Sequence, residues 1–189
     1  MQPVMWRCLL AGMVWTSVAF AASRGWAQDA AEDLNAPGPQ HKLLDALVGV
    51  WDVSVKFPVG PGEYREGKAS CEARWVMDGR FVRLEYNSSF AGKPLTVVRY
   101  VGYDRHRQKF VEMHFESSHT DVMHSEGEAA ADQKSFTCNG RHVDVFSDRD
   151  VPVRTVTRFE PDHSFTLAMT YSPDDEKASR TVTLDHRPK

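Results

Sequence analysis

Residues 50–57, VWDVSVKF, alternate between apolar and polar side chains. Successive side chains of a β-strand point to opposite faces, so the pattern predicts a half-buried strand. Its inward face would carry the apolar members, Trp51, Val53, Val55 and Phe57. The stretch 68–77, KASCEARWVM, repeats the alternation, and the MDGR that ends it at 77–80 offers Gly79 for a tight turn. Together the two stretches predict antiparallel neighbours.

Similar alternation continues to the end of the chain. Further strand-like segments follow at a spacing of about ten residues, bounded by turn signals such as AGKP at 91–94 and DRHR at 104–107. Asn139 and Gly140 are typical of a two-residue hairpin turn. Short connections favour neighbouring pairing over the long crossovers of a Greek-key sandwich. We therefore expect an all-β, antiparallel up-and-down barrel of about ten strands.

The start of the chain predicts export. Arg7 is followed by an apolar run that ends at Ala22, too short to span a bilayer comfortably, and then by small residues that suit a cleavage site. We expect a signal peptide over 1–28, cleaved somewhere in 21–30, then a flexible leader over 29–40 and one domain over 41–189. The protein would then be periplasmic or secreted, with no membrane span after cleavage. An uncleaved N-terminal anchor is the alternative.

Charge and motifs narrow the function classes. Loss of Arg7 and Arg24 leaves 21 of the 23 basic residues against 26 acidic ones, which argues against a nucleic-acid partner. The hydrolase patterns G-x-S-x-G and H-E-x-x-H are absent, so no catalytic residue is predicted. Cys71 and Cys138 follow the signal segment, and in an exported protein they could form a disulfide or remain two buried thiols.

Several motifs, taken in order, resemble a known family. HKLLDALVGVW at 41–51 predicts a short helix that ends at Gly49, and its G-x-W is similar to the first-strand start of calycin-type barrels. DGRFVRLEY at 78–86, VGYDRHRQKFV at 101–111 and SEG at 125–127 resemble the bacterial domain of unknown function 1579 family. The resemblance covers about 40–187. It implies a calycin-like barrel closed by a short helix and no particular activity.

The resemblance to calycin-like barrels also suggests two classes of ligand, small apolar molecules and haem. Lipocalins bind small apolar molecules, and nitrobindin-like barrels hold haem through a late-strand histidine, a position that His186 loosely resembles. The alternative to a haem ligand is that His186 is a half-exposed side chain near the end of the chain. No C-x-x-C-H motif supports covalent haem, and no cofactor is predicted with any specificity.

The segment 110–128, FVEMHFESSHTDVMHSEGE, predicts a hairpin with a turn at SSHT. If His114 faces His124, a patch of four possible zinc or iron ligands results: Glu112, His114, His124 and Glu126. A register shift of one residue would separate them. A solvated outer face and a polar interior lining are the alternatives.

A barrel of this size can enclose one small ligand. The side chains predicted to line its interior are Trp51, Trp75, Tyr103, Met169 and Tyr171. The same side chains could instead fill the interior as a packed core. The sequence therefore favours a binding protein for a small apolar or amphipathic molecule, with a metal-dependent site or a purely structural or interaction barrel as alternatives.

Overall fold

A computed structural model describes residues 33–60, 62–90, 92–144, 148–172 and 179–189. Within these ranges a short 3-10 helix, η1 (Pro39–Leu47), precedes ten strands. The strands are β1 (Gly49–Gly60), β2 (Glu63–Val76), β3 (Phe81–Phe90), β4 (Lys93–Asp104), β5 (Lys109–Glu116), β6 (Met123–Ala129), β7 (Ser135–Asp144), β8 (Arg149–Phe159), β9 (Phe165–Tyr171) and β10 (Arg180–Pro188). No helix in the described ranges is long and apolar enough to cross a bilayer.

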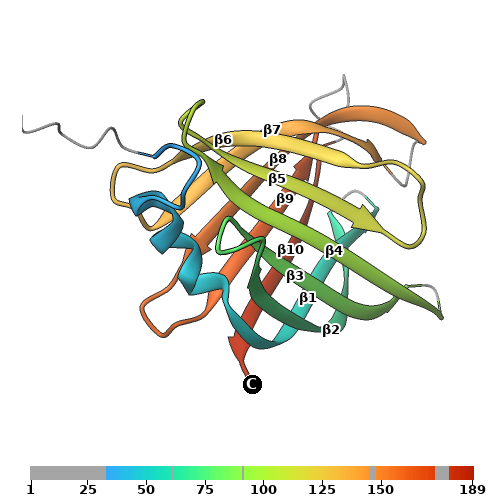
Figure 1. Ribbon diagram of the computed structural model, residues 1–189. Coiled ribbons are helices and arrows are strands. Elements are labelled where there is room, and N and C mark those ends of the chain that lie inside the picture. Colours follow the sequence, from blue (N-terminus) through green and yellow to red (C-terminus); the bar gives the residue numbers. More distant parts are fainter. Residues whose placement is uncertain (1–32, 61, 91, 145–147, 173–178) are drawn as a thin grey trace, which may run out of the picture. The chain divides into compact units, whose positions relative to one another are not determined.

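The strands form a closed antiparallel barrel (Figure 1). Each strand pairs with its neighbours in sequence, and β1 also pairs with β10, with Val53 opposite His186. Closure leaves no free sheet edge. The predicted all-β, up-and-down barrel and its short N-terminal helix are both confirmed.

The predicted turn at Asn139 and Gly140 is wrong. Both residues lie inside β7, where Gly140 is opposite Ser125 of β6 and Val153 of β8. A Cβ at Gly140 would lie 2.3 Å from the carbonyl oxygen of His124 and 2.8 Å from Cβ of Ser125. Glycine therefore serves the close approach of two strands here, and not the positive φ of a turn.

We expect Gly140→Ala to destabilise the barrel by about 1–3 kcal/mol, because the added methyl group must displace the β6 backbone. Urea denaturation would measure the loss. Gly67→Ala is the matched control within β2, since a Cβ there would meet its nearest neighbour, Phe57, at an ordinary 3.7 Å. Equal stability of the two variants would contradict this account of Gly140.

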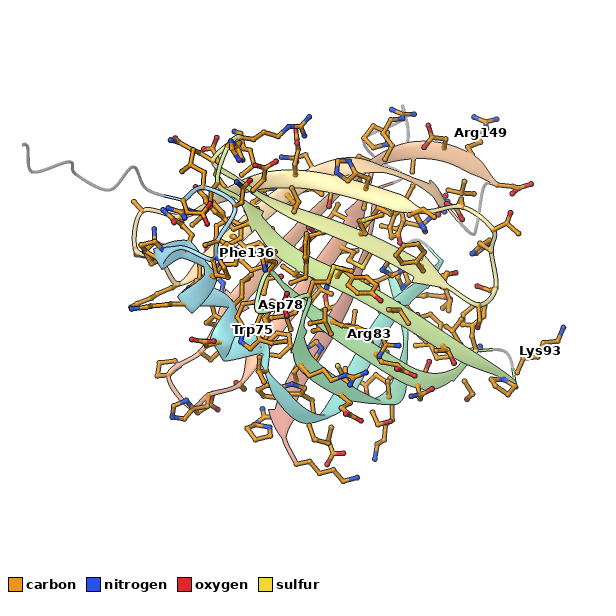
Figure 2. All side chains as sticks on the ribbon, in the orientation of Figure 1. Trp75, Asp78, Arg83, Lys93, Phe136 and Arg149 are labelled. Carbon is orange, nitrogen blue, oxygen red and sulfur yellow. The ribbon has the colours of Figure 1, made fainter. Side chains whose placement is uncertain are left out.

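Apolar side chains fill the end of the barrel beneath η1, here called the helix end. Phe110 stacks on Phe136 with ring centroids 4.8 Å apart. Trp51 donates a hydrogen bond from Nε1 to the carbonyl oxygen of Leu47 in η1, at 3.0 Å. Figure 2 shows Phe136 and Trp75 near η1, while Lys93 and Arg149 project from the opposite end. The helix therefore closes one end of the barrel, and the interior beneath it is a packed apolar core.

Both cysteines in the part of the chain that the structure describes are free and buried. Cys71 lies on β2 and Cys138 on β7, and these strands are five places apart in either direction around the ring. Burial raises the pKa of the Cys71 thiol to about 12 and also raises that of Cys138. The sequence left open a disulfide or two buried thiols, and the structure has two buried thiols. The reason is that β2 and β7 lie on opposite sides of the barrel.

Candidate ligand-binding cavity

The end of the barrel opposite η1, here called the cavity end, is hollow. Its cavity has a volume of about 360 Å³, within the range of small-molecule sites. The strands β1, β4, β9 and β10 supply much of its apolar wall: Val55, Phe57, Val97, Leu167, Met169 and Leu184. These positions continue the inward alternation that fills the helix end. The barrel is thus packed at one end and hollow at the other.

A buried ion pair lies at the side of the cavity. Nη2 of Arg99 donates to Oε1 of Glu112 at 2.7 Å, and their side chains are 3% and 0% exposed. Oε2 of Glu112 accepts hydrogen bonds from the hydroxyls of Ser125 at 3.0 Å and Thr155 at 2.6 Å. Burial alone would lower the pKa of Arg99, but Glu112 and Tyr86 beside it raise that pKa above its ordinary value. Arg99 is therefore cationic.

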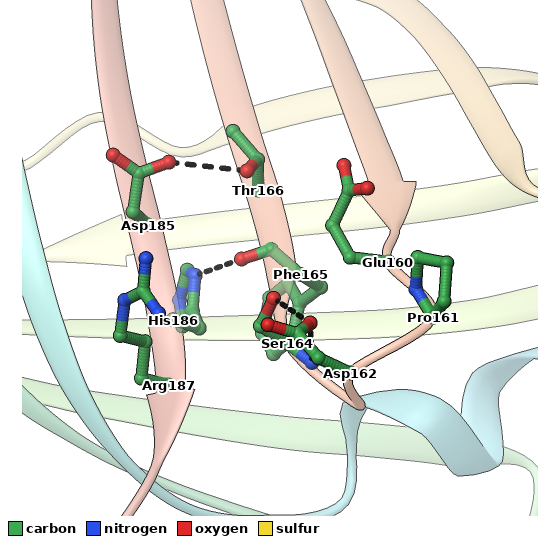
Figure 3. A pocket seen from close by; sticks show the side chains of 9 residues that line it. All are labelled: Glu160, Pro161, Asp162, Ser164, Phe165, Thr166, Asp185, His186 and Arg187. Atoms are coloured by element: carbon green, nitrogen blue, oxygen red, sulfur yellow. Dashed lines mark hydrogen bonds between the residues drawn. The ribbon is translucent and has the colours of Figure 1, made fainter.

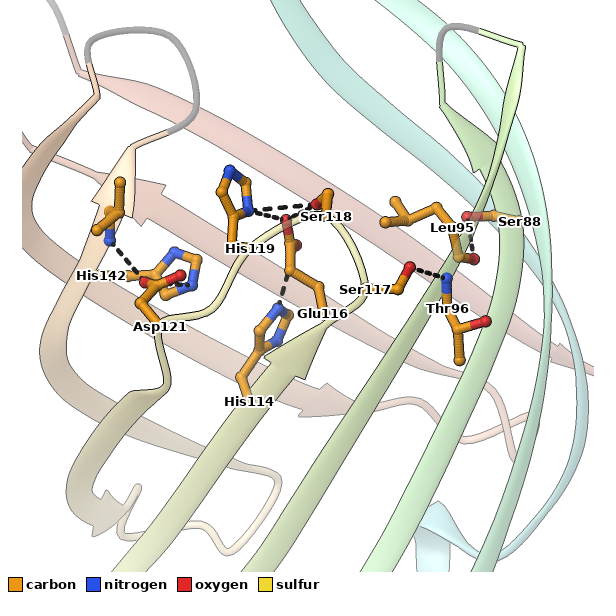
Figure 4. A network of polar contacts seen from close by, with 11 residues as sticks. Ser88, Leu95, Thr96, His114, Glu116, Ser117, Ser118, His119, Asp121 and His142 are labelled. Atoms are coloured by element: carbon orange, nitrogen blue, oxygen red, sulfur yellow. Dashed lines mark hydrogen bonds and ion pairs between the residues drawn. The ribbon is translucent and has the colours of Figure 1, made fainter.

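Polar side chains on β5 and the following loop surround the mouth of the cavity (Figure 4). Glu116 accepts a hydrogen bond from the hydroxyl of Ser118 at 2.5 Å and lies 2.5 Å from Nδ1 of His119. Nε2 of His114 is 3.5 Å from Oε2 of Glu116. Burial would raise the pKa of Glu116, but its contacts with His114, Ser118 and His119 lower it to about 2. Glu116 is therefore an anion near pH 7.

A second histidine lies beside this group. The rings of His114 and His142 meet edge to face with centroids 5.4 Å apart. Nε2 of His142 is 3.4 Å from Oδ2 of Asp121, which also accepts a hydrogen bond from the backbone N–H of Val143 at 3.3 Å. Burial, and then the neighbouring His114, lower the pKa of His142. His142 is consequently neutral near pH 7.

Some buried polar atoms at the cavity lack a hydrogen-bond partner within the described part of the chain. They are Nε of Arg99, both ring nitrogens of His114 and, beside the cavity, both ring nitrogens of His142 and Oδ1 of Asp121. The contact of His114 with Glu116 is too long and poorly directed to be a hydrogen bond. Such groups are costly to bury unless something else completes their hydrogen bonding.

A family model described as "Protein of unknown function (DUF1579)" matches residues 36–187. The chain belongs to the DUF1579 family. The match confirms the resemblance seen in the sequence motifs, which extended over nearly the same residues. No curated protein matches the chain. The family description names no activity, so the function of this DUF1579 barrel has to be argued from its own side chains.

The five side chains predicted to line the interior divide between the two ends. Met169 and Tyr171 line the cavity. Trp51, Trp75 and Tyr103 belong instead to the packing at the helix end, where Trp75 donates a hydrogen bond from Nε1 to Asp45 of η1 at 2.9 Å. The prediction separated inward from outward positions but could not say how far along the barrel each one lies.

The DUF1579 barrel does not bring together the four predicted metal ligands. His114 is opposite Met123 and Met113 is opposite His124, the one-residue shift that separates them. Glu112 and His114 therefore point inward, while His124 and Glu126 are exposed on the outer face. Across all described residues, no group of three or more His, Cys, Asp or Glu side chains has a geometry that could hold a metal ion.

Both ring nitrogens of His186 have hydrogen-bond partners within the helix end. Its Nδ1 is 3.2 Å from the carbonyl oxygen of Phe165 and its Nε2 is 3.0 Å from the hydroxyl of Tyr86. Its ring also stacks on Phe165 with centroids 3.8 Å apart. This histidine also lines a hollow of about 380 Å³ next to the β8–β9 turn. Figure 3 shows the side chains that line this hollow. Because both ring nitrogens have partners, neither is available to haem iron, and the side chain is buried rather than half-exposed.

Sequence reasoning missed Arg99. It lies in PLTVVRYVGYD at 94–104, on the same face as Val97 and Val101. A charged residue at an inward position of an apolar strand face is a detectable signal, since buried cations need a partner. That partner, Glu112, was assigned to a metal patch because its strand register was unknown.

Proposed function

We propose that this DUF1579 protein is exported and binds a small amphipathic molecule inside the cavity end of its barrel. The observation that carries the proposal is the cavity of about 360 Å³, which has an apolar wall and a few buried polar groups. Pockets that combine apolar walls with few polar side chains are typical of small-molecule sites. Export is supported by the signal-like residues 1–28.

The contrast between the two ends argues against a filled structural barrel. At the helix end, aromatic rings such as Phe110, Phe136 and Phe165 occupy the interior and are at most 2% exposed. At the cavity end, several inward positions of β9 and β10 carry smaller side chains without a ring, including Leu167 and Val182. Cores are normally packed without voids larger than a water molecule, so a hollow of this size suits a ligand.

Mass spectrometry of the exported protein under native and denaturing conditions tests the proposal. We expect an organic mass that is present in the native protein and lost on denaturation. Leu167→Trp should abolish it, because Leu167 is fully buried and lines the cavity. Val50→Trp is the matched control, since it adds the same ring at an exposed position.

Three results would count against this function. A native protein with no added mass would favour a structural or interaction barrel. A mass retained by the Leu167→Trp variant would place the ligand outside the cavity. A metal-sized mass in place of an organic one would contradict the proposed ligand class.

A further inference from the structure

Two side chains that line the cavity carry nitrogen atoms without a hydrogen-bond partner, and this inference rests on the function proposed above. Arg99 on β4 and His114 on β5 are directly opposite each other in the strand register. Both line the cavity, and they are 2% and 5% exposed. Nε of Arg99 and both ring nitrogens of His114 have no hydrogen-bond partner within the described residues. They therefore form one polar spot on an otherwise largely apolar wall.

The unpartnered nitrogen atoms of this polar spot require a hydrogen-bond acceptor. Nε of arginine can only donate, and a neutral imidazole donates from one of its nitrogens. The two donors come from adjacent strands, where opposing Cβ atoms lie roughly 5 Å apart. A group with two oxygens could therefore reach both donors. A buried donor that stays unmatched carries a desolvation penalty, which an acceptor oxygen would remove.

The carboxylates near the cavity do not complete the hydrogen bonding of these nitrogens. Glu112 uses Oε1 for Nη2 of Arg99 and Oε2 for two hydroxyls. Asp144 accepts from Nη1 of Arg180 at 2.7 Å. Glu116 uses Oε1 for Ser118 and His119, and its Oε2 lies 3.5 Å from Nε2 of His114 without forming a hydrogen bond. Nε of Arg99 and Nδ1 of His114 therefore remain without an acceptor among the described residues.

We propose that the ligand is an apolar monocarboxylic acid whose carboxylate binds Nε of Arg99 and His114. Charge-assisted hydrogen bonds to a carboxylate are stronger than those to a neutral oxygen, so the acid is favoured over an alcohol of the same length. The hydrocarbon part lies along the aliphatic wall formed by Val97, Leu167 and Leu184.

Calorimetric titration with sodium decanoate and with 1-decanol tests this head-group assignment. We expect the full-length exported protein to bind decanoate at least about tenfold more tightly than decanol, as one or two charged hydrogen bonds imply. His114→Phe should reduce the preference for the acid, because the ring keeps its bulk and loses its donor while Nε of Arg99 can still donate. His114→Gln should restore a preference for the acid, since its amide can donate again. Circular dichroism checks that each variant is folded.

The outcomes separate this inference from the proposed function. Equal binding of decanoate and decanol by the wild-type protein, abolished by Leu167→Trp, would overturn the carboxylate assignment and leave the cavity function standing. An acid preference of unchanged size in the His114→Phe variant would overturn the role of His114. Failure of both molecules to bind, together with an empty native protein, would overturn both proposals.

Discussion

Arg99→Met is expected to destabilise the barrel by about 3–5 kcal/mol, because it leaves the buried carboxylate of Glu112 without its cation. The side chain of Glu112 is 0% exposed, and water cannot replace the guanidinium. The double variant Arg99→Met, Glu112→Met should recover most of that loss, since it removes both charges and keeps similar volume. Urea denaturation of the wild type, both single variants and the double variant gives the coupling energy.

Arg107→Met provides the control for this cycle. Arg107 pairs with Glu126 at 3.0 Å, but their side chains are 63% and 44% exposed. Exposed pairs contribute at most about 1 kcal/mol, so this variant should be nearly as stable as the wild type. Equal effects of the Arg99 and Arg107 variants would show that water reaches Glu112.

Acidification is expected to destabilise the protein from about pH 6.5 downward. Burial, followed by the nearby charge of Arg99, lowers the pKa of His186 from 6.5 to about 3. Between these two values the unfolded chain binds a proton at His186 that the folded chain does not, so stability falls as the pH falls. The full difference corresponds to roughly 4–5 kcal/mol, reached near pH 3.

His186→Gln should flatten this profile, because glutamine does not titrate and can still hydrogen bond. The comparison is made on the slope of the unfolding free energy between pH 6.5 and about 5.5, above most of the titration of Glu116 in the unfolded chain, where its pKa is 4.5. Burial also lowers the pKa values of His41 and His142, so part of the slope should remain. An unchanged slope would mean that His186 is not buried as described.

The fold was predictable because local alternation and short turns determine most of it. Gly79 illustrates a successful prediction: its φ of +78° fits the expected turn between β2 and β3. Gly140 illustrates the limit, because an Asn-Gly pair is compatible with either a turn or a close contact between strands. Only the distance to a neighbouring strand separates these two roles, and distance between strands is a property of the assembled barrel.

The site was harder to predict than the fold. Residues 117–122 connect β5 to β6, a longer connection than the four-residue SSHT turn taken from the sequence, and the pairing register follows from that connection. A shift of one residue turned His124 outward while His114 faces the cavity. Alternation also cannot distinguish the depth of Trp51 from that of Met169, since both are simply inward. Register and depth depend on contacts between distant segments.

The pairing of β1 with β10 has a consequence for how the chain folds. Every other strand pair joins neighbours in sequence and can form as soon as both strands exist. Closure alone requires residues from opposite ends of the domain, such as Val53 and His186, to meet. Contacts of such long sequence separation form slowly. During synthesis, one edge of β1 therefore has no partner strand until β10 has emerged. This edge is where a chaperone would be most useful.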